Sequence, residues 1–392
     1  MPYFDHNATV PLHPAARRAW LDVVDRAWHN PSGLYAAATA ARDVLDDCRD
    51  RLAAVLDSDP ARIVFTAGAT AAANALARHV AATAAPGARA LLSAIEHPCV
   101  AESFHAAAPG RIAEIPVDCH GVVATGAVEA ALDAGGQPPV IVSVMAASNE
   151  SGTIQPWHEI AAICRAHGTH FFTDAAQWLG KLPARGLGAC DWVLGSGHKV
   201  GGPKGVGFLV VPACDTAFRG DRGGPQEHGR HAGTENVAAI AALVAAVEAR
   251  EAEIVGRTES WAAARDAAEQ RLRERIPDAV VIGAGAPRLW NTLAVVIPGV
   301  DGKKLVARLN RAGIAASTGS ACSAGAVSIP RILTAIGGDS LGLGAGDLRG
   351  MVRLSGGWET TPDEWLAAAD AVAAAVDHAG EGLPRVSLGG AT

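Results

Sequence analysis

The chain has little of what marks nucleic-acid binding, export or membrane insertion. Its 33 Lys and Arg residues are outnumbered by 40 Asp and Glu residues, a formal charge of −7, so we expect no direct contact with nucleic acid. The opening MPYFDHNATV contains neither a basic nor an apolar segment, and we expect no signal peptide. Apolar stretches such as Val237–Val247 are too short to span a bilayer, so no membrane partner is expected.

Cysteine is sparse and forms no disulfide or metal-binding pattern. The seven cysteines are scattered, none belongs to a CxxC pair, and their number is odd. We therefore expect reduced thiols, a cytoplasmic location and no metal site. Six cysteines suit the role of small buried apolar residues, namely Cys48, Cys99, Cys119, Cys164, Cys190 and Cys214. Cys322 lies in a different setting, a segment rich in Gly, Ser and Ala.

Internal repeats and low-complexity linkers are also missing, whereas the chain is rich in apolar residues, at 49% of 392. From about residue 60 to 215, short apolar runs alternate with helical patterns such as Trp157–Ala166. This alternation predicts an α/β fold with a mainly parallel sheet that is covered on both faces, and functional sites at the carboxyl ends of its strands. The runs are Ala88–Ser93, Val140–Val144, His170–Thr173, Trp192–Leu194 and Val206–Val211.

The pattern changes after residue 235. A long stretch rich in Ala, Glu and Arg, Asn236–Arg275, predicts a helix that carries the chain into a second, smaller α+β domain. We predict a large domain over 14–255 and a small domain over 1–13 and 256–392, with a loose tail after 380. Further elements of the small domain are predicted at Val280–Ile282, Thr292–Ile297, Lys303–Asn310, Met351–Ser355 and Pro362–His378.

Lys199 lies in the glycine-rich run GSGHKVGGPKGVG, directly after an apolar strand. A buried lysine near other cations can form a Schiff base with a carbonyl compound. Asp174 ends the preceding strand, 25 residues earlier, which places both side chains at adjacent strand ends. A carboxylate buried there needs a partner, and the pyridinium nitrogen of pyridoxal 5′-phosphate (PLP) is one. Taken singly, Lys199 also suits an exposed loop and Asp174 a helix cap.

Two further segments complete this pattern. Gly68, Ala69 and Thr70 follow the apolar Ile63–Phe65 and open an Ala-rich helix, so their free N–H groups and the Thr70 hydroxyl can hold a phosphate. His97 precedes Pro98 at a predicted helix start, where a flat imidazole can stack on a pyridine ring. Each feature alone is also an ordinary structural one.

With these segments in order, the chain resembles the cysteine desulfurases, fold-type-I PLP enzymes of the class V aminotransferase group. The resemblance implies a large domain with a seven-stranded sheet flanked by helices, plus the smaller α+β domain. It runs over nearly the whole chain through the motifs YFDHNAT, NPSG, FTAGAT, EHP, SNESGTIQP, TDAAQ, SGHKVGGPKGVG, GGPQEHGRHAGTEN, NTL, PGVDG, STGSACSAG and VRLSGG.

The resemblance also implies a role for each matching residue. Lys199 would be the Schiff-base lysine, with Asp174 on the ring nitrogen and Gln177 on the phenolic oxygen. His97 would stack on the ring and act as a base. Asn149 and Arg353 would bind the substrate carboxylate. The phosphate would be held by Ala69, Thr70, Ser196 and His198, and by Thr234 from the other subunit of a homodimer with shared active sites.

Cys322 would be the sulfur-accepting nucleophile. Small residues around it predict an accessible, reactive thiol. Pro330 follows eight residues later, and the GSAC run resembles the long-loop group of the family. L-Cysteine would be converted to L-alanine, with a persulfide left on Cys322 and passed to an acceptor protein for iron–sulfur cluster assembly or thio-modification.

Five positions depart from the family pattern and indicate a divergent branch: Tyr35, Ala71, Ser148, His231 and Trp358. None removes a residue needed for the core chemistry. Other PLP reactions, such as selenocysteine lysis or transamination, stay open, although Cys322 would be superfluous in an aminotransferase. A non-catalytic scaffold that kept the fold is a further alternative, and the Lys199, Asp174 and Cys322 set argues against it.

Overall fold

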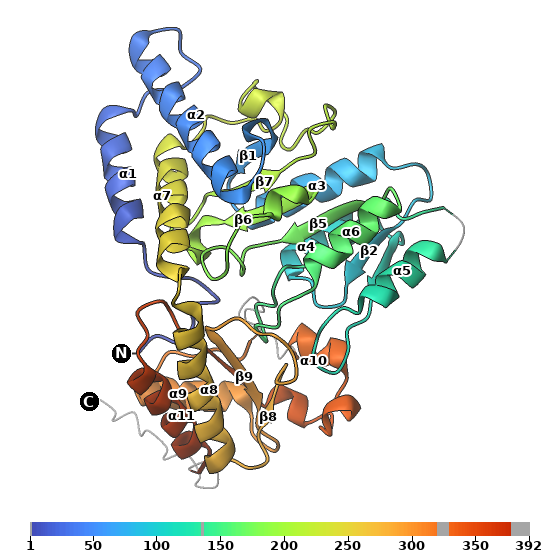
Figure 1. The fold of residues 1–392 in the computed structure, drawn as a ribbon, viewed down its shortest axis with the longest axis vertical. Coiled ribbons are helices and arrows are strands. Elements are labelled where there is room, and N and C mark those ends of the chain that lie inside the picture. The colour runs from blue at the N-terminus through green and yellow to red at the C-terminus, as the bar shows by residue number, and fades with distance from the viewer. Residues whose placement is uncertain (1, 135–136, 320–328, 378–392) are drawn as a thin grey trace, which may run out of the picture.

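The computed structural model describes residues 2–134, 137–319 and 329–377 (Figure 1). Cys322 and the tail after residue 377 lie outside these ranges. The α-helices are α1 (Pro14–Arg26), α2 (Ala36–Leu56), α3 (Ala69–Thr83), α4 (Pro98–Ala107), α5 (Thr125–Asp133), α6 (Trp157–Ala166), α7 (Val237–Ile254), α8 (Thr258–Arg275), α9 (Gly302–Arg311), α10 (Arg331–Ile336) and α11 (Pro362–Asp377). The strands are β1 (Ile63–Thr66), β2 (Ala90–Ser93), β3 (Ile112–Ile115), β4 (Ile141–Ser143), β5 (His170–Asp174), β6 (Trp192–Ser196), β7 (Gly207–Val210), β8 (Val280–Val281), β9 (Thr292–Val296) and β10 (Met351–Ser355).

A seven-stranded sheet forms the larger part of the molecule, in the order β1-β7-β6-β5-β4-β2-β3. The pairs β2–β3, β2–β4, β4–β5 and β5–β6 are parallel, and β7 pairs antiparallel with both β6 and β1. This confirms the predicted α/β fold with a mainly parallel sheet. The predicted helix Trp157–Ala166 is α6, with the same bounds.

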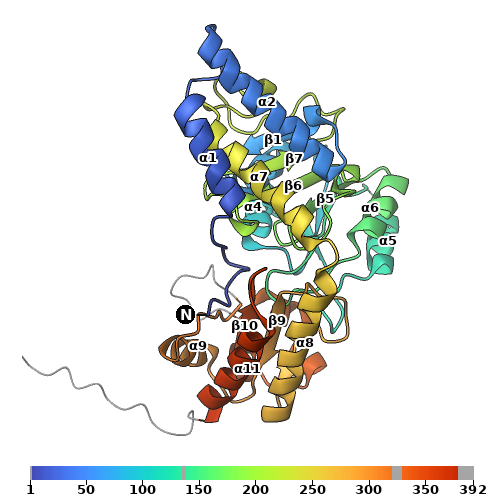
Figure 2. The ribbon, with the colours of Figure 1, turned by 60° about the vertical axis from the view of Figure 1, so that its left-hand side comes forward.

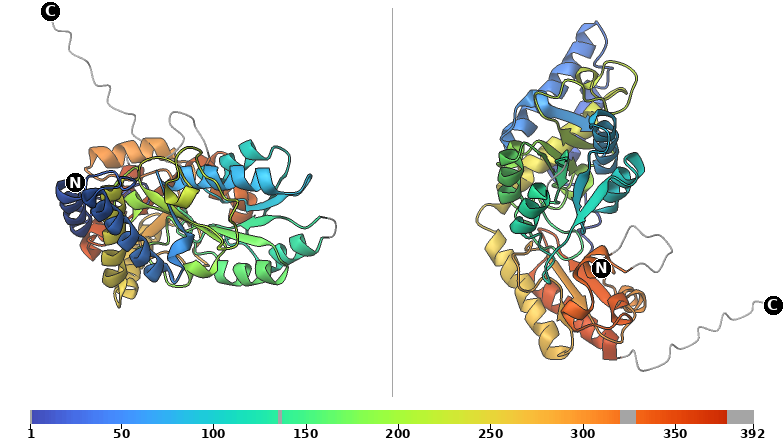
Figure 3. Two further views of the ribbon diagram at one scale, coloured as in Figure 1. Left: turned by 90° about the horizontal axis from the view of Figure 1, so that it is seen from above. Right: turned by 90° about the vertical axis from the view of Figure 1, so that its right-hand side faces the viewer.

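Successive residues of the strands pack against different layers of helices, because side chains alternate between the two faces of a sheet. Phe171 belongs to a core that includes residues of α2, α6 and α7, whereas its neighbour Phe172 belongs to a second core with α3 and α4. Val193 and Trp192 divide in the same way. The two layers of helices on either side of the sheet are visible in Figure 3. Burial on both faces explains why the strands are almost wholly apolar.

The helix predicted over Asn236–Arg275 is two helices rather than one. α7 ends at Ile254 and α8 begins at Thr258, with Gly256 between them at φ 69°. A left-handed residue ends an α-helix, and glycine adopts that conformation without strain. The two helices follow one another from the larger to the smaller part (Figures 1 and 2). The break is consistent with a domain boundary at 255/256, which stays a prediction.

The smaller part consists of the antiparallel sheet β10-β9-β8 packed against α8, α9 and α11. The N-terminal segment contributes to it: Phe4 is fully buried in that core, and Asp5 forms a bridge with Ser355 beside β10. A few residues later, the Val10 N–H donates to the carbonyl of His198 in the larger part, at 3.1 Å. Residues 2–10 therefore connect the two parts beside the carboxyl ends of the large sheet.

The cysteine prediction was wrong at three positions. Cys48, Cys164 and Cys190 are buried as expected, but Cys119 and Cys214 are exposed, and Cys99 is partly exposed. The reason is local: Cys119 lies in a turn after β3, Cys214 follows β7 in a loop, and Cys99 lies in the first turn of α4 at the edge of a cavity. In the described part of the chain, no helix combines the length and apolar character needed to cross a bilayer.

Candidate active site

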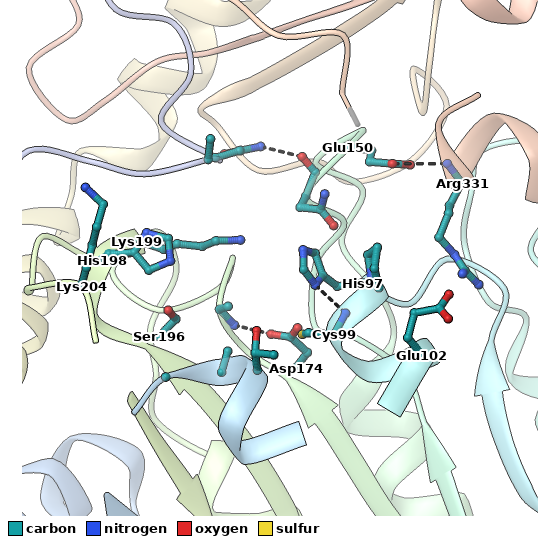
Figure 4. Close-up of a pocket in the computed structure, with 18 of the residues that line it drawn as sticks. His97, Cys99, Glu102, Glu150, Asp174, Ser196, His198, Lys199, Lys204 and Arg331 are labelled. Carbon is teal, nitrogen blue, oxygen red and sulfur yellow. Dashed lines mark hydrogen bonds between the residues drawn. The ribbon is translucent and has the colours of Figure 1, made fainter. Parts of the chain in front are cut away.

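A cavity of about 830 Å³ lies at the carboxyl ends of the central strands (Figure 4). Segments from both parts of the molecule line it. Of the residues predicted for the site, those on its wall are Ala69, Thr70, His97, Asn149, Asp174, Ser196, His198, Lys199 and Arg353. Gln177 and Thr234 are not on this wall, and Cys322 lies outside the described residues.

Lys199 and Asp174 lie at adjacent strand ends, as their spacing predicts. β5 and β6 are parallel neighbours with Asp174 opposite Leu194, and Lys199 ends the short turn of 3₁₀ helix, Gly197–Lys199, that follows β6. The Lys199 side chain extends into the middle of the cavity (Figure 4). This arrangement brings an amine and a carboxylate from different strands to one ligand-sized space.

Asp174 is buried, with 7% of its surface exposed. One carboxylate oxygen accepts the Ala176 N–H at 2.8 Å, and the described residues provide no ion-pair partner. Burial raises the pKa of Asp174, while the Ala176 N–H and the charge of Lys199 act in the opposite direction. A buried carboxylate of this kind is stabilised by a cationic ring nitrogen, so it fits a pyridinium ring.

The start of α3, which lies on the wall of the cavity, suits a phosphate group. Gly68 is the N-cap of α3 and has no side chain to satisfy the first helical N–H groups, so those of Ala69 and Thr70 are available to an anion. The hydroxyl of Ser196 and the ring of His198 lie on the same wall. Burial and nearby lysines lower the pKa of His198 to about 4, so its neutral ring offers hydrogen bonds rather than charge.

His97 has a defined tautomer. It is the N-cap of α4, and its Nδ1 accepts the backbone N–H of Cys99 at 3.1 Å. The proton of the neutral ring is therefore on Nε2. Burial and the charges of Lys199 and Arg331 lower the pKa of His97 to about 3, so the ring is neutral at physiological pH. In this state Nε2 is a hydrogen-bond donor, and the role of His97 as a base stays a prediction.

Gln177 is buried next to the cavity but does not line it. Its Nε2 donates to the carbonyl oxygen of Asn7 at 2.9 Å, and its Oε1 accepts from the amine of Lys181. Lys181 is fully buried, and burial together with the charges of Lys199 and Arg353 lowers its pKa well below the usual value. These two contacts fix the orientation of the Gln177 amide with its nitrogen on the Asn7 side. Sequence reasoning missed Lys181, although a lysine in the apolar run after TDAAQ is an unusual feature.

Asn7 and Glu150 are further cavity residues to which the sequence analysis gave no role. Asn7 is buried and donates to the Asn149 carbonyl at 3.1 Å and to Thr292 at 2.9 Å, so it joins the two parts of the molecule. Glu150 accepts the N–H of Ile332 at 2.7 Å at the start of α10. Both lie in quoted motifs, YFDHNAT and SNESG, but their partners are distant in the sequence and no local signal identifies them.

Thr234 lines a separate, smaller cavity of about 290 Å³. The two cavities share Ala67, Gly205 and Val206 on their walls. The loop that leads to Thr234 is held by Glu227, whose carboxylate forms a buried ion pair with Arg49 at 2.9 Å. The contact of Thr234 with the cofactor of a partner subunit stays a prediction.

The departures from the family pattern have local explanations where the structure shows their contacts. The Ser148 hydroxyl accepts the Glu150 N–H at 3.2 Å and so stabilises the turn that carries Asn149. The Trp358 ring lies 3.7 Å from the guanidinium carbon of Arg250, a cation–π contact. Neither replaces a residue of the cavity wall.

Comparisons with known proteins agree with this fold and cavity. Residues 2–364 match the aminotransferase class-V family. A cysteine desulfurase of Klebsiella pneumoniae is 36% identical over 341 residues, which cover 85% of this chain and 83% of that protein. A NifS-like protein from Rickettsia africae superposes with a TM-score of 0.85 at 26% identity, over 96% of this chain and 99% of that one. SspA, solved in complex with cysteine, superposes with a TM-score of 0.76 at 27% identity, over 91% and 98%.

The fold and the match over residues 2–364 define a class-V aminotransferase-type protein. Within that class, the chain belongs to the cysteine desulfurase family.

Proposed function

We propose that this protein is a PLP-dependent cysteine desulfurase that converts L-cysteine to L-alanine and passes the sulfur to an acceptor protein. The observation that carries the proposal is the placement of Lys199 and the buried Asp174 at adjacent strand ends, facing one cavity. The family supports the same activity, and SspA, a structural neighbour, binds cysteine.

The residues present suit PLP. Lys199 would hold it covalently, Asp174 would pair with its ring nitrogen, and the start of α3 with Ser196 and His198 would bind its phosphate. When bound, PLP supplies an electron sink for the negative charge that forms at the substrate α-carbon. The neutral ring of His97 can also help to stabilise negative charge, because its Nε2–H can donate a hydrogen bond inside the cavity.

The substrate needs a carboxylate site and a proton carrier. Arg353 offers a buried guanidinium on the cavity wall for the α-carboxylate. The Lys199 amine extends into the middle of the cavity and would carry the α-proton. We propose that Cys322, outside the described residues, attacks the substrate sulfur as a thiolate. The S–S bond of a persulfide forms as the C–S bond of the substrate breaks, and the electron pair of that bond stays with the carbon, which is protonated to become the methyl group of alanine. The sulfur is then transferred to an acceptor thiol.

The test combines two substitutions with the purified holoenzyme. The wild type should yield alanine from cysteine and, with reductant, sulfide. Lys199→Ala should lose the covalent PLP absorbance, and Cys322→Ser should keep it but release sulfide at least a hundredfold more slowly. Cys119→Ser, at an exposed cysteine, is the matched control and should retain full activity. Wild-type-like desulfuration by Cys322→Ser would refute the role of that thiol, and an unchanged Lys199→Ala spectrum would refute the cofactor assignment.

We also propose a homodimer with Thr234 completing the partner's phosphate site, and a cytoplasmic location. The six described cysteines form no disulfide, which is usual in a reducing compartment.

A further inference from the structure

Arg353 and Asp5 form an ion pair at the edge of the cavity. Arg353 comes from the middle of β10, and its side chain is 2% exposed. Its Nη2 lies 2.6 Å from Oδ1 of Asp5, which the N-terminal segment places beside β10 through its bridge with Ser355. Arg353 lines the cavity but Asp5 does not, so the carboxylate contacts the guanidinium from outside the substrate space.

A second set of contacts holds the other terminal nitrogen. Nη1 of Arg353 donates to the carbonyl oxygen of Asn149 at 2.7 Å and lies 3.4 Å from that of Gly319. Nε is buried and has no hydrogen-bond partner among the described residues. The guanidinium is therefore fixed at both terminal nitrogens, while the donor nearest its stem is unused.

We propose that Asp5 is a positioning residue for substrate recognition: it holds the Arg353 guanidinium on the cavity wall in the orientation in which it binds the α-carboxylate of the amino-acid substrate. The inference rests on the proposed function, which makes that carboxylate the ligand of Arg353. Bidentate binding needs two N–H groups in one plane and one orientation, and a long side chain loses rotamer freedom when it adopts them. Because the contact with Asp5 already restricts the Arg353 side chain in the free protein, less rotamer freedom is lost when the substrate binds.

Asp5 has two opposing effects on substrate binding. It orders the Arg353 guanidinium, which favours binding, but its negative charge also repels the carboxylate of the substrate. The Asp5 side chain is 22% exposed, which places its charge in partial contact with water. Solvent weakens its repulsion of the substrate, whereas its hydrogen bond to Nη2 is direct and largely shielded. We therefore expect removal of the charge to weaken substrate binding.

The experiment compares Asp5→Asn with wild type in the holoenzyme. KM for L-cysteine should rise about tenfold, with a smaller change in kcat. Calorimetry with L-alanine, the product, should show its dissociation constant rising by a similar factor. Ethylamine, which is alanine without the carboxylate, should bind both proteins alike. Asp22→Asn is the charge-matched control, since Asp22 forms an exposed ion pair with Arg26 on α1, its one ion-pair partner among the described residues.

Equal weakening for alanine and ethylamine would overturn the proposal, because it would show a general structural defect. An unchanged alanine affinity would overturn it as well. In an Arg353→Lys background, Asp5→Asn should add little further loss, and full additivity would mean that Asp5 does not act through Arg353. If Asp5→Asn folds poorly, Asp5→Glu serves the same comparison. Failure of the wild type to convert cysteine would instead refute the proposed function.

Discussion

At the scale of single residues, several buried ionisable groups lie on or near the wall of the cavity, and burial shifts their pKa values. Glu96, Glu150 and Asp174 have raised pKa values and Lys181 a lowered one, each chiefly through burial. Burial therefore disfavours the charged form of each of these groups, because an ion costs more to bury than a neutral side chain.

Glu96 gives a prediction about pH. It is fully buried, its Oε1 accepts from Ser93 and from the Met145 N–H, and burial raises its pKa to about 7. Since the unfolded value is near 4.5, the folded state binds the extra proton between these values, and stability falls as pH rises through that window. Ionisation at higher pH costs on the order of 3 kcal/mol.

Glu96→Gln should remove this dependence, because the amide keeps an acceptor for Ser93 and never ionises. Relative to wild type, its free energy of unfolding should therefore increase by up to about 3 kcal/mol between pH 5 and pH 8. Thermal or urea unfolding of the apo protein at both pH values measures this. Glu129→Gln, on an exposed position of α5, should follow the wild-type curve. A constant offset between wild type and Glu96→Gln would contradict the prediction.

At the scale of elements, the proposed phosphate site depends on how closely β7 approaches the start of α3. A Cβ on Gly207 would lie 2.5 Å from the carbonyl oxygen of Gly195 and 2.8 Å from Cα of Gly68. Both obstacles are backbone atoms, so neither can move aside as a flexible side chain would. The contact positions the N-cap of α3 next to Gly207, which pairs with Ser196 at the carboxyl end of β6.

Gly207→Ala should displace that N-cap and weaken PLP binding. We expect a loss of roughly 1–3 kcal/mol in stability, as is usual for overpacking, and an affinity for PLP about tenfold lower. Equilibrium dialysis with PLP and thermal unfolding of the apo protein check both. Gly126→Ala is the matched control: nothing lies within 4 Å of a Cβ there, and alanine favours the helix α5. Unchanged PLP affinity in Gly207→Ala would show that the close approach has no part in binding.

At the scale of the whole molecule, the proposed dimer can be tested by complementation. Lys199→Ala and Thr234→Ala should each be inactive or nearly so as homodimers. A heterodimer purified through two different tags has one site with both residues intact if Thr234 serves its partner's cofactor. It should then recover about half of the wild-type activity. If Thr234 serves its own subunit, no intact site exists and activity stays at the level of the parents.

Much of the large sheet was predictable because burial on both faces produces continuous apolar runs. Those runs located β2, β4, β5, β6 and β7, and the spacing of Asp174 and Lys199 placed them at adjacent strand ends. β3 was missed because Ile115 is the one buried residue of its four and an exposed glutamate, Glu114, interrupts the apolar run. The break between α7 and α8 was missed because a single Gly256 does not outweigh the helical pattern on both sides.

The sequence by itself determined the fold class and the family, and it predicted which residues bear the chemistry, because local periodicity and ordered motifs are properties of neighbouring positions. Only the tertiary structure decided what those residues contact. Asp5 meets Arg353, and Asn7 meets Gln177, across more than 160 positions of the chain. Such pairings depend on how the N-terminal segment passes between the two parts of the molecule. No local sequence pattern predicts the course of this segment, because packing between distant elements sets it.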